Sequence, residues 1–335
     1  MKGGNCMDEM TLSIAIPTYN RSDFLDFFLE IHVPIARKYN VNFYISDNSS
    51  SDDTIEVIKK WKKIYDSIYY FSFDSTVSGD KNRDKVLSMS ESKYTWLMGD
   101  TYEIPESSLV QVIDFLSNNK NYEFVVVNFC NNIKEIDNCE YDDPNKVLKD
   151  LAWMISGICC NIFHKSVIGK GEYDYDGNED FAHVGFVLNF LLKKKALLYW
   201  MQTVSVVSLK TPVRKEGWGK RFFLIMFENW PKFIYGLSEE FDSSSKDSAL
   251  MTLPRKTRIL SAKSMLSLRG QGNFDWNKYN EYKDRFWIAP RFFRYYSFVI
   301  SIFPIFFCKG LIVVVEWVRR KRYQIKKKIN PKVVI

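Results

Sequence analysis

Carboxylates that follow apolar runs mark the places in this sequence where chemistry is most expected. Asp47 ends the run 41–47 (VNFYISD), and Asp100 comes two residues after the run 94–98 (YTWLM). The polar residues 18–21 (TYNR) follow a third apolar run in the same way. Such residues can also serve only to cap helices or to meet solvent. Their place directly after apolar strands favours ligand binding at Asp47 and Asp100.

The elements that must position these residues alternate between strand and helix over the first 130 residues. We expect strands at residues 12–17, 41–47, 68–73, 94–98 and 124–128, and helices at residues 21–39, 54–65, 81–90 and 106–118. This alternation indicates an α/β fold with a mainly parallel sheet covered by helices on both faces. Ligands bind beyond the carboxyl ends of the strands in such sheets, so the polar sites point to one shared pocket.

Several other kinds of site are disfavoured by the sequence. The turn after the first strand reads PTYNRSD and contains no glycine, so it lacks the GxGxxG of dinucleotide-binding folds, and no Walker-type P-loop occurs. The six cysteines form no CxxC pair, and with three histidines the chain has no zinc-ligand spacing. Dinucleotide, P-loop and structural zinc sites are therefore not expected.

The C-terminal 45 residues combine apolar runs with positive charge. The segment 297–318 is apolar but is interrupted by Lys309 and Glu316, and Pro304 would kink a helix there. Eight of the 47 Lys and Arg residues lie in residues 319–335, which hold no acidic residue. We expect an interfacial or re-entrant helical segment with a polybasic tail on anionic lipid, rather than a spanning helix. A buried C-terminal helix with a solvated basic end is the alternative.

Three motifs resemble those of a known family. They are residues 13–21 (SIAIPTYNR), 45–54 (ISDNSSSDDT) and 94–100 (YTWLMGD). In this order and spacing they resemble family 2 inverting glycosyltransferases of the GT-A fold. Ser156-Gly157 and residues 181–185 (FAHVG) make the chain look most like bacterial O-antigen and capsule sugar transferases of the abequosyltransferase-like kind. The resemblance implies transfer of one sugar, with inversion, from a nucleotide-sugar donor to a saccharide hydroxyl.

The resemblance also implies a set of donor-binding residues. They are Pro17, Thr18, Tyr19, Arg21, Asp47, Asn82, Arg83 and Asp100. Pro17, Thr18 and Tyr19 would border the nucleobase, and Asp47 would accept a hydrogen bond from a ring nitrogen of the base. Asn82 and Arg83 would reach the ribose or the phosphates, although a role on a surface helix would explain them equally well.

The family's Asp-rich metal motif is degenerate here. That motif normally holds a divalent cation that neutralises the leaving diphosphate. In this chain it reads Gly99-Asp100-Thr101-Tyr102-Glu103, so only its first carboxylate, Asp100, is retained. Mg²⁺ or Mn²⁺ on Asp100 therefore stays open. A basic loop with Arg214, Lys215 and Trp218 is the alternative partner of the diphosphate.

The acceptor side is assigned by the same resemblance. An inverting transfer needs a carboxylate that removes the proton of the acceptor hydroxyl. Asp180 is the first choice and Glu179 the second, since the pair precedes the apolar helix expected at residues 181–192. Acidic residues also favour helix N-termini for dipole reasons alone. Three further residues would line the acceptor site: Trp153, Ser156 and His183. Residues 153–157 would form a strand and turn at its floor.

These observations predict a three-part chain. It comprises a GT-A domain (11–235), a helical extension (236–290) with a Ser-rich link at 243–248 and a helical stretch at 254–268, and a membrane anchor with a polybasic tail (291–335). The opening MKGGNCMDEM lacks the apolar core of a signal peptide. We therefore expect the protein to act at the cytoplasmic face of the cell membrane. The expected partners are a nucleotide-diphosphate sugar, a lipid-linked saccharide and an anionic membrane, with no nucleic acid. The alternative is a catalytically impaired relative that serves as a scaffold in a membrane glycan-assembly complex.

Overall fold

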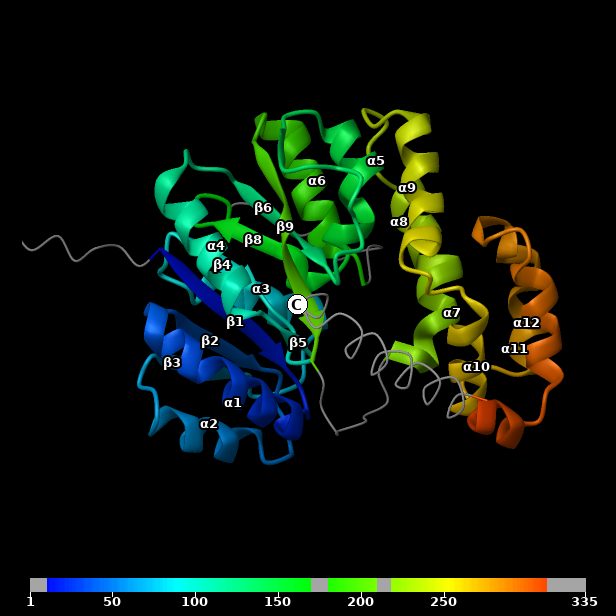
Figure 1. Ribbon diagram of the computed structural model, residues 1–335, viewed down its shortest axis with the longest axis horizontal. Coiled ribbons are helices and arrows are strands. Elements are labelled where there is room, and N and C mark those ends of the chain that lie inside the picture. The colour runs from blue at the N-terminus through cyan, green and yellow to red at the C-terminus, as the bar shows by residue number, and fades with distance from the viewer. Residues whose placement is uncertain (1–10, 170–179, 210–217, 312–335) are drawn as a thin grey trace, which may run out of the picture. The chain divides into compact units, whose positions relative to one another are not determined.

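The computed structural model describes residues 11–169, 180–209 and 218–311 (Figure 1). The chain divides into two compact units. The first comprises Met1–Lys215 with Lys232–Ala249, and the second comprises Glu216–Pro231 with Leu250–Ile335. The residues predicted at Glu179, Arg214 and Lys215, and the polybasic tail, lie outside the described residues.

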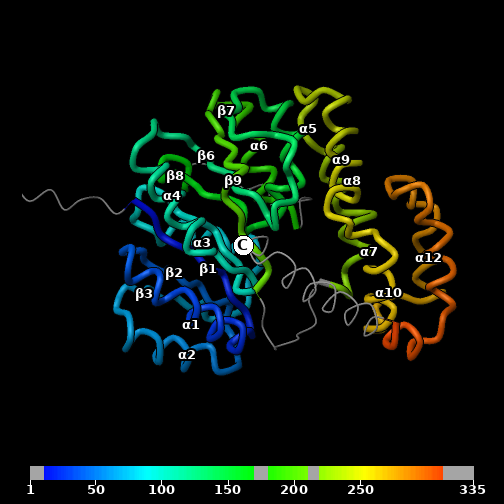
Figure 2. The backbone as a smooth tube through the Cα atoms, in the orientation of Figure 1, coloured from blue at the N-terminus to red at the C-terminus, as the bar shows by residue number. Residues whose placement is uncertain are grey.

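A mostly parallel sheet forms the centre of the first unit, as predicted. Its strands are β1 (Leu12–Thr18), β2 (Asn42–Asp47), β3 (Ile68–Ser72), β4 (Tyr94–Leu97), β5 (Tyr102–Glu103), β6 (Phe124–Phe129), β7 (Cys139–Tyr141), β8 (Asn161–His164) and β9 (Leu198–Ser208). The order is β3-β2-β1-β4-β8-β6-β9-β5, with β7 also paired to β9. Figure 2 follows the backbone through most of these strands. Parallel pairing joins β3, β2, β1 and β4, and also β6 to β9, whereas β8 runs antiparallel to both of its neighbours.

The helices of the first unit follow the predicted alternation. They are α1 (Ser22–Tyr39), α2 (Thr54–Lys62), α3 (Gly79–Ser88), α4 (Glu106–Asn118), α5 (Pro144–Ile155) and α6 (Ala182–Lys194). Helix α3 begins two residues before its predicted start, because the Ser78 side chain caps it by accepting a hydrogen bond from the Lys81 N–H. Sequence periodicity located all of these helices except α5, and side-chain caps set the first turns of α3 and α5.

The expectation for residues 153–157 was wrong. Residues 153–155 are the last turn of α5, and Ser156 is its C-cap, so no strand lies there. The helix is started upstream by Asp143, whose carboxylate accepts from the Asn145 N–H at 2.9 Å, and by Pro144 in the first turn. A short apolar stretch alone does not distinguish a buried strand from a buried helical turn.

His32 ties α1 to the chain that leads into α4. Its Nδ1 donates to the Phe28 carbonyl at 2.7 Å, and its Nε2 accepts from the Ile104 N–H at 3.0 Å. Burial lowers the pKa of His32 to about 4, against a smaller opposing effect of the Phe28 carbonyl. Both ring nitrogens of the neutral imidazole are thus hydrogen-bonded. Protonation of Nε2 would make it a donor facing the Ile104 N–H, and that hydrogen bond would be lost.

The second unit is helical. Its helical segments are Trp218–Arg221, α7 (Phe222–Leu224), Ile225–Asn229, α10 (Ala262–Gly270), α11 (Trp276–Tyr282), Lys283–Ile288, α12 (Phe293–Ile302) and residues 305–311, while α8 (Trp230–Tyr235) and α9 (Ser243–Lys256) each belong partly to both units. Aromatic rings fill its core, where Phe227 packs against Phe286 with ring centroids 4.9 Å apart. Among the residues that the structure describes, no helix combines the length and the apolarity needed to cross a bilayer.

Two expectations for residues 236–290 were also wrong. The serines at 243–248 are no link but the first turns of α9, and the Asp242 carboxylate accepts from the Ser245 N–H at 2.7 Å and from its hydroxyl. The helical stretch expected at 254–268 is broken at residues 257–261, between α9 and α10. Serines suit a helix start when an aspartate caps it, which composition alone did not reveal.

Candidate active site

The loops that follow β1 and β2 are tied together by hydrogen bonds. The Asn20 N–H donates to Ser50 Oγ at 2.8 Å, and the Ser51 N–H donates to Asn20 Oδ1 at 2.8 Å. The Ser22 N–H donates to Asp52 Oδ2 at 2.9 Å. Asn20 has a φ of +50°, in the left-handed region that asparagine tolerates better than most residues. The carboxyl edge of the sheet is therefore held in place before any ligand binds.

Asp47 lies at the end of β2, where its carboxylate is almost completely buried. Its Oδ1 accepts from the Ser50 N–H at 3.0 Å and from Ser50 Oγ at 2.5 Å, and its Oδ2 accepts from the Tyr70 hydroxyl at 2.8 Å. Burial, followed by the hydrogen bond to Asp47, raises the pKa of Tyr70 to about 12. A carboxylate offers about four lone pairs. Asp47 can therefore accept one more donor, on Oδ2.

Thr18 and Asn82 are hydrogen-bonded to each other at the edge of the sheet where Asp47 lies. The amide of Asn82, on α3, donates to the Thr18 carbonyl at 3.2 Å, and both residues are buried. The Thr18 Oγ1 and Asn82 Oδ1 atoms have no hydrogen-bond partner within the described parts of the chain. Buried polar atoms without a partner are rare and indicate a bound ligand or water. Pro17 is half-buried next to them, and Tyr19 is 45% exposed at the rim.

Arg21 and Asp100, both predicted site residues, are in direct contact. The Arg21 Nε lies 2.9 Å from both carboxylate oxygens of Asp100, which is 4% exposed. The guanidinium carbon of Arg21 also lies 4.5 Å from the centre of the Phe24 ring. The pair forms because β1 and β4 are parallel neighbours, which brings the residues after both strands to the same edge of the sheet.

The side chains around Asp100 do not fit a divalent cation. Mg²⁺ and related hard cations take about six oxygen ligands. Thr101 and Tyr102 stand where further carboxylates would be needed, and Glu103 belongs to β5, paired with Val207. No cluster of three or more His, Cys, Asp or Glu residues suited to a metal occurs in the described ranges. Both oxygens of Asp100 already bind Arg21.

Asp180 directly precedes α6, as predicted, and its backbone is strained. Its φ of +74° lies in the left-handed region, and the residue is half-buried. The next residue, Phe181, is the N-cap of α6 and stacks on Phe233 with ring centroids 5.5 Å apart. Strained non-glycine residues concentrate at functional sites, where the surrounding packing enforces them. The packing of Phe181 thus fixes the backbone of Asp180 just before this helix.

His183 links α6 to the C-cap of α5. Its Nε2 donates to the Ser156 carbonyl at 3.2 Å. Burial and then the positive charge of Arg83 lower the pKa of His183 to about 3, so the ring is neutral. Arg83 is itself ion-paired with Asp80 on α3. A neutral, buried His183 suits a positioning role better than that of a base.

Three other predicted residues belong to elements other than the strands and helix α3 that carry the donor residues. Trp153 is 4% exposed, and its indole N–H donates to the Asp150 carbonyl at 3.2 Å, which suits core packing. Ser156 donates its hydroxyl to the Trp153 carbonyl at 2.7 Å as the C-cap of α5. Trp218 begins a short helical segment of the second unit.

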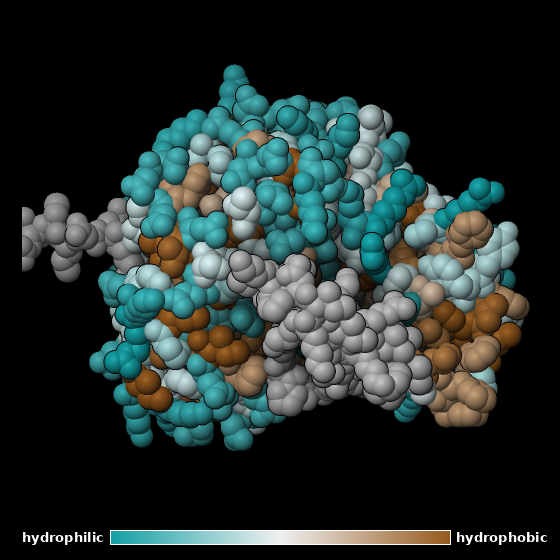
Figure 3. Space-filling model, in the orientation of Figure 1, coloured by the Kyte–Doolittle hydropathy of each residue, from teal (hydrophilic) through white to brown (hydrophobic). Residues whose placement is uncertain are grey.

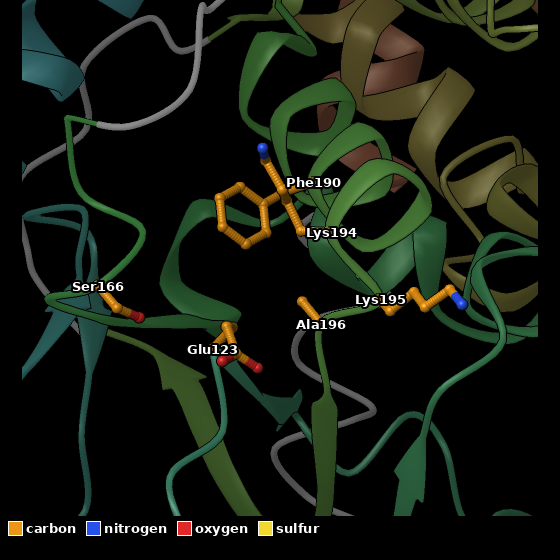
Figure 4. Close-up of a pocket in the computed structure, with 6 residues that line it drawn as sticks. All are labelled: Glu123, Ser166, Phe190, Lys194, Lys195 and Ala196. Carbon is orange, nitrogen blue, oxygen red and sulfur yellow. The ribbon is translucent and has the colours of Figure 1, made fainter.

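A depression at the other edge of the sheet contains none of these residues. Its volume is about 540 Å³, and Figure 4 shows its six lining residues: Glu123, Ser166, Phe190, Lys194, Lys195 and Ala196. Glu123 precedes β6 and Ala196 precedes β9, so it lies at the amino ends of these strands. Glu123 Oε2 accepts from the Leu197 N–H at 2.8 Å, an internal bond that joins the two strand entries.

Sequence reasoning missed the residues that support the site. Tyr70 holds Asp47 from β3, and Ser50 and Asp52 tie the two loops. The aspartate- and serine-rich turn at residues 48–53 was a signal for the loop contacts, since such side chains bond nearby backbone groups. No sequence signal identifies Tyr70, because its contact depends on the register of β2 against β3.

Comparisons with known proteins agree with the fold and the motifs. Residues 13–160 match the model of glycosyl transferase family 2. Over 110 residues the chain is 31% identical to the abequosyltransferase RfbV of Salmonella typhimurium, a match that spans 32% of this chain and 33% of that protein.

Two solved structures share the fold at low sequence identity. TarS of S. aureus in complex with UDP-GlcNAc is 13% identical, with a TM-score of 0.54 over 87% of this chain and 89% of that one. The mannosyltransferase PcManGT of Pyrobaculum calidifontis, in complex with GDP-Man and Mn²⁺, is 12% identical, with a TM-score of 0.54 over 88% and 87%. The resemblance predicted from the motifs is confirmed over residues 13–160 by the match to glycosyl transferase family 2, and the fold is GT-A-like α/β.

Proposed function

We propose that this chain transfers one sugar, with inversion, from a nucleotide-diphosphate donor to a hydroxyl of a saccharide in cell-surface polysaccharide synthesis. The family 2 match and the partial identity to an abequosyltransferase support this proposal. The observation that carries it is the set of buried acceptor atoms at one sheet edge: Asp47 Oδ2, Thr18 Oγ1 and Asn82 Oδ1. They match the donor groups of a nucleoside, whose base carries N–H groups and whose ribose carries hydroxyls.

Each of these atoms has a place in donor binding. The free lone pair of Asp47 accepts a base N–H, and Pro17 and Tyr19 border the ring. Thr18 Oγ1 and Asn82 Oδ1 accept from the ribose hydroxyls. Since Asp47 and its partners are already fixed by Ser50 and Tyr70, binding orders few side chains of the protein.

Asp180 acts as the general base. Its carboxylate takes the proton of the acceptor hydroxyl while the hydroxyl oxygen attacks the anomeric carbon from the face opposite the nucleotide. The bond between the anomeric carbon and the diphosphate breaks, and the nucleoside diphosphate leaves with that electron pair. The sugar is transferred with inversion, and His183 holds the start of α6 against Ser156.

The acceptor is a lipid-linked saccharide, and the second unit docks on an anionic membrane. Helix α12 buries Phe293 and Ile300 together with Ser297 and Ser301, and it exposes a stripe of apolar residues on its other face. That stripe comprises Tyr295 (71% exposed), Phe298 (41%), Val299 (48%) and Ile302 (55%). It continues into Phe306, which is 67% exposed. Figure 3 shows apolar side chains gathered over α12 and the segment that follows it.

Charge complementarity supports anionic lipid as the occupant of this surface. Exposed Arg291, Arg294 and Lys309 flank the apolar stripe, and exposed aromatic rings are typical of the headgroup level. Each basic residue near an anionic bilayer contributes about 1 kcal/mol, so the stripe and its flanking charges add up to reversible binding. Docking at the cytoplasmic face of the cell membrane would concentrate the chain with an acceptor confined to the bilayer.

Calorimetric titration with UDP, GDP, CDP and dTDP tests the proposal. The base is left open because TarS carries UDP-GlcNAc and PcManGT carries GDP-Man. We expect one nucleotide to bind at least tenfold more tightly than the others, because Asp47 reads the edge of the base. A protein that binds none of the four would not be a transferase of this kind, and the scaffold role would then be favoured.

A further inference from the structure

We infer that Arg21, held by Asp100, binds the donor diphosphate directly, so that this chain binds its nucleotide without a divalent cation. The inference rests on the proposed function and concerns the same site. The side chains around Asp100 do not supply the oxygen ligands that Mg²⁺ or Mn²⁺ requires. A cation on Asp100 would have to displace the guanidinium from both carboxylate oxygens, each 2.9 Å from Arg21 Nε.

The geometry of Arg21 is that of a preformed phosphate-binding fork. Only its Nε is engaged by Asp100, and its Nη1 and Nη2 atoms donate to none of the residues that the structure describes. The side chain is 29% exposed. The four remaining N–H groups are therefore available on an accessible side chain. A guanidinium with two free amino groups matches two phosphate oxygens at once.

Four contacts fix the side chain and the backbone around Arg21. Asp100 holds Nε, and Phe24 lies 4.5 Å below the guanidinium carbon. The Arg21 carbonyl accepts from the Leu25 N–H at 3.0 Å in the first turn of α1. Its neighbour Asn20 is bound to the loop after β2. Because these contacts remove most of the rotamer freedom of Arg21, little conformational entropy is lost when the diphosphate binds.

Arg21 and Asp100 cancel in formal charge, so Arg21 acts through directed hydrogen bonds rather than through net positive charge. Its position beyond β1, next to Thr18 and opposite the end of β4, is where the diphosphate must lie if Asp47 binds the base. Parallel strands place Asp47, Thr18 and Asp100 along one edge of the sheet. The base and the diphosphate of one nucleotide can therefore reach Asp47 and Arg21 together.

The test compares the preferred nucleoside diphosphate with its nucleoside, each titrated in EDTA and in Mn²⁺. For the wild type we expect diphosphate affinity to agree within about twofold in the two buffers. Arg21→Gln should weaken diphosphate binding about 10- to 100-fold, the range of a lost charge-assisted hydrogen bond, and leave the nucleoside unchanged. Arg37→Gln, on the exposed far end of the same helix, is the matched control and should bind both like the wild type.

Arg21→Gln removes the contact of Arg21 with the buried Asp100 carboxylate and can unfold the protein. The double variant Arg21→Gln/Asp100→Asn removes both charges and should retain the fold, with diphosphate affinity reduced to the same extent. The inference is overturned if EDTA lowers wild-type diphosphate affinity tenfold or more, or if Arg21→Gln binds the diphosphate normally. If either of these results is found while nucleoside binding is intact, only the inference about Arg21 fails and the proposed function is retained. Absence of binding by every nucleoside and nucleotide overturns the proposed function itself.

Discussion

Replacing Asp47 by asparagine separates the structural role of this carboxylate from its role in nucleotide binding. In the Asp47→Asn variant the amide oxygen can keep the bonds from Ser50, and the Tyr70 hydroxyl can turn to accept from the new amide. We therefore expect the free energy of unfolding to fall by no more than about 1 kcal/mol. The position that accepted a base N–H now carries a donor, which should cost about 1.5–3 kcal/mol of binding, or a 10- to 150-fold rise in Kd.

Calorimetry and urea unfolding measure the two effects separately. Asp47→Ala provides the contrast, because it removes all three hydrogen bonds and should lower the free energy of unfolding by about 2–4 kcal/mol. Asp53→Asn is the matched control, since this nearby carboxylate is exposed and caps no helix with its side chain. If Asp47→Asn bound the nucleotide with wild-type affinity, Asp47 would be a purely structural residue and the assignment of the base site would be wrong.

Three further predictions concern catalysis, stability and membrane binding. Asp180→Asn should lower turnover at least 100-fold with donor Kd nearly unchanged; wild-type turnover would place the base elsewhere. His32 and His183 are neutral in the folded protein and take up protons on unfolding below about pH 6.5. The free energy of unfolding, measured with urea, should therefore be lower at pH 5 than at pH 7.5 by about 2 kcal/mol per histidine. An unchanged value would contradict their buried neutral state. Phe298→Ser/Ile302→Ser should abolish flotation with anionic liposomes, whereas Ile64→Ser, an exposed apolar residue of the first unit, should not. Flotation of the double variant at the wild-type level would rule out the α12 stripe.

The fold of the first half could be predicted from the sequence because the patterns that indicate each strand and helix lie within that element. Apolar runs of strand length, each followed by a segment of helical periodicity, located β1 to β4 and α1 to α4 to within a few residues. Asp47 and Asp100 could be assigned to one edge because parallel strands present their carboxyl ends together. The inserted antiparallel strand β8 had no such signal, since its pairing with β4 and β6 is decided by tertiary contacts.

The contacts of the site were less predictable than its location. The pairing of Arg21 with Asp100 joins residues 79 positions apart, and it became foreseeable only once β1 and β4 were known to be neighbours. The neutral state of His183 follows from its burial and from Arg83, neither of which the apolar helix pattern reveals. The strained backbone of Asp180 depends likewise on the packing of Phe181 against Phe233.

Transfer of labelled sugar tests the central claim most directly. Purified full-length protein is incubated with nucleotide sugars that carry the preferred base, together with bacterial membranes as the source of lipid-linked acceptor. We predict that label enters the lipid extract with the wild type and that the Asp180→Asn and Asp47→Asn variants transfer far less. If the wild type binds its nucleotide but moves no label from any donor, the chain is not a transferase, and the scaffold role takes its place.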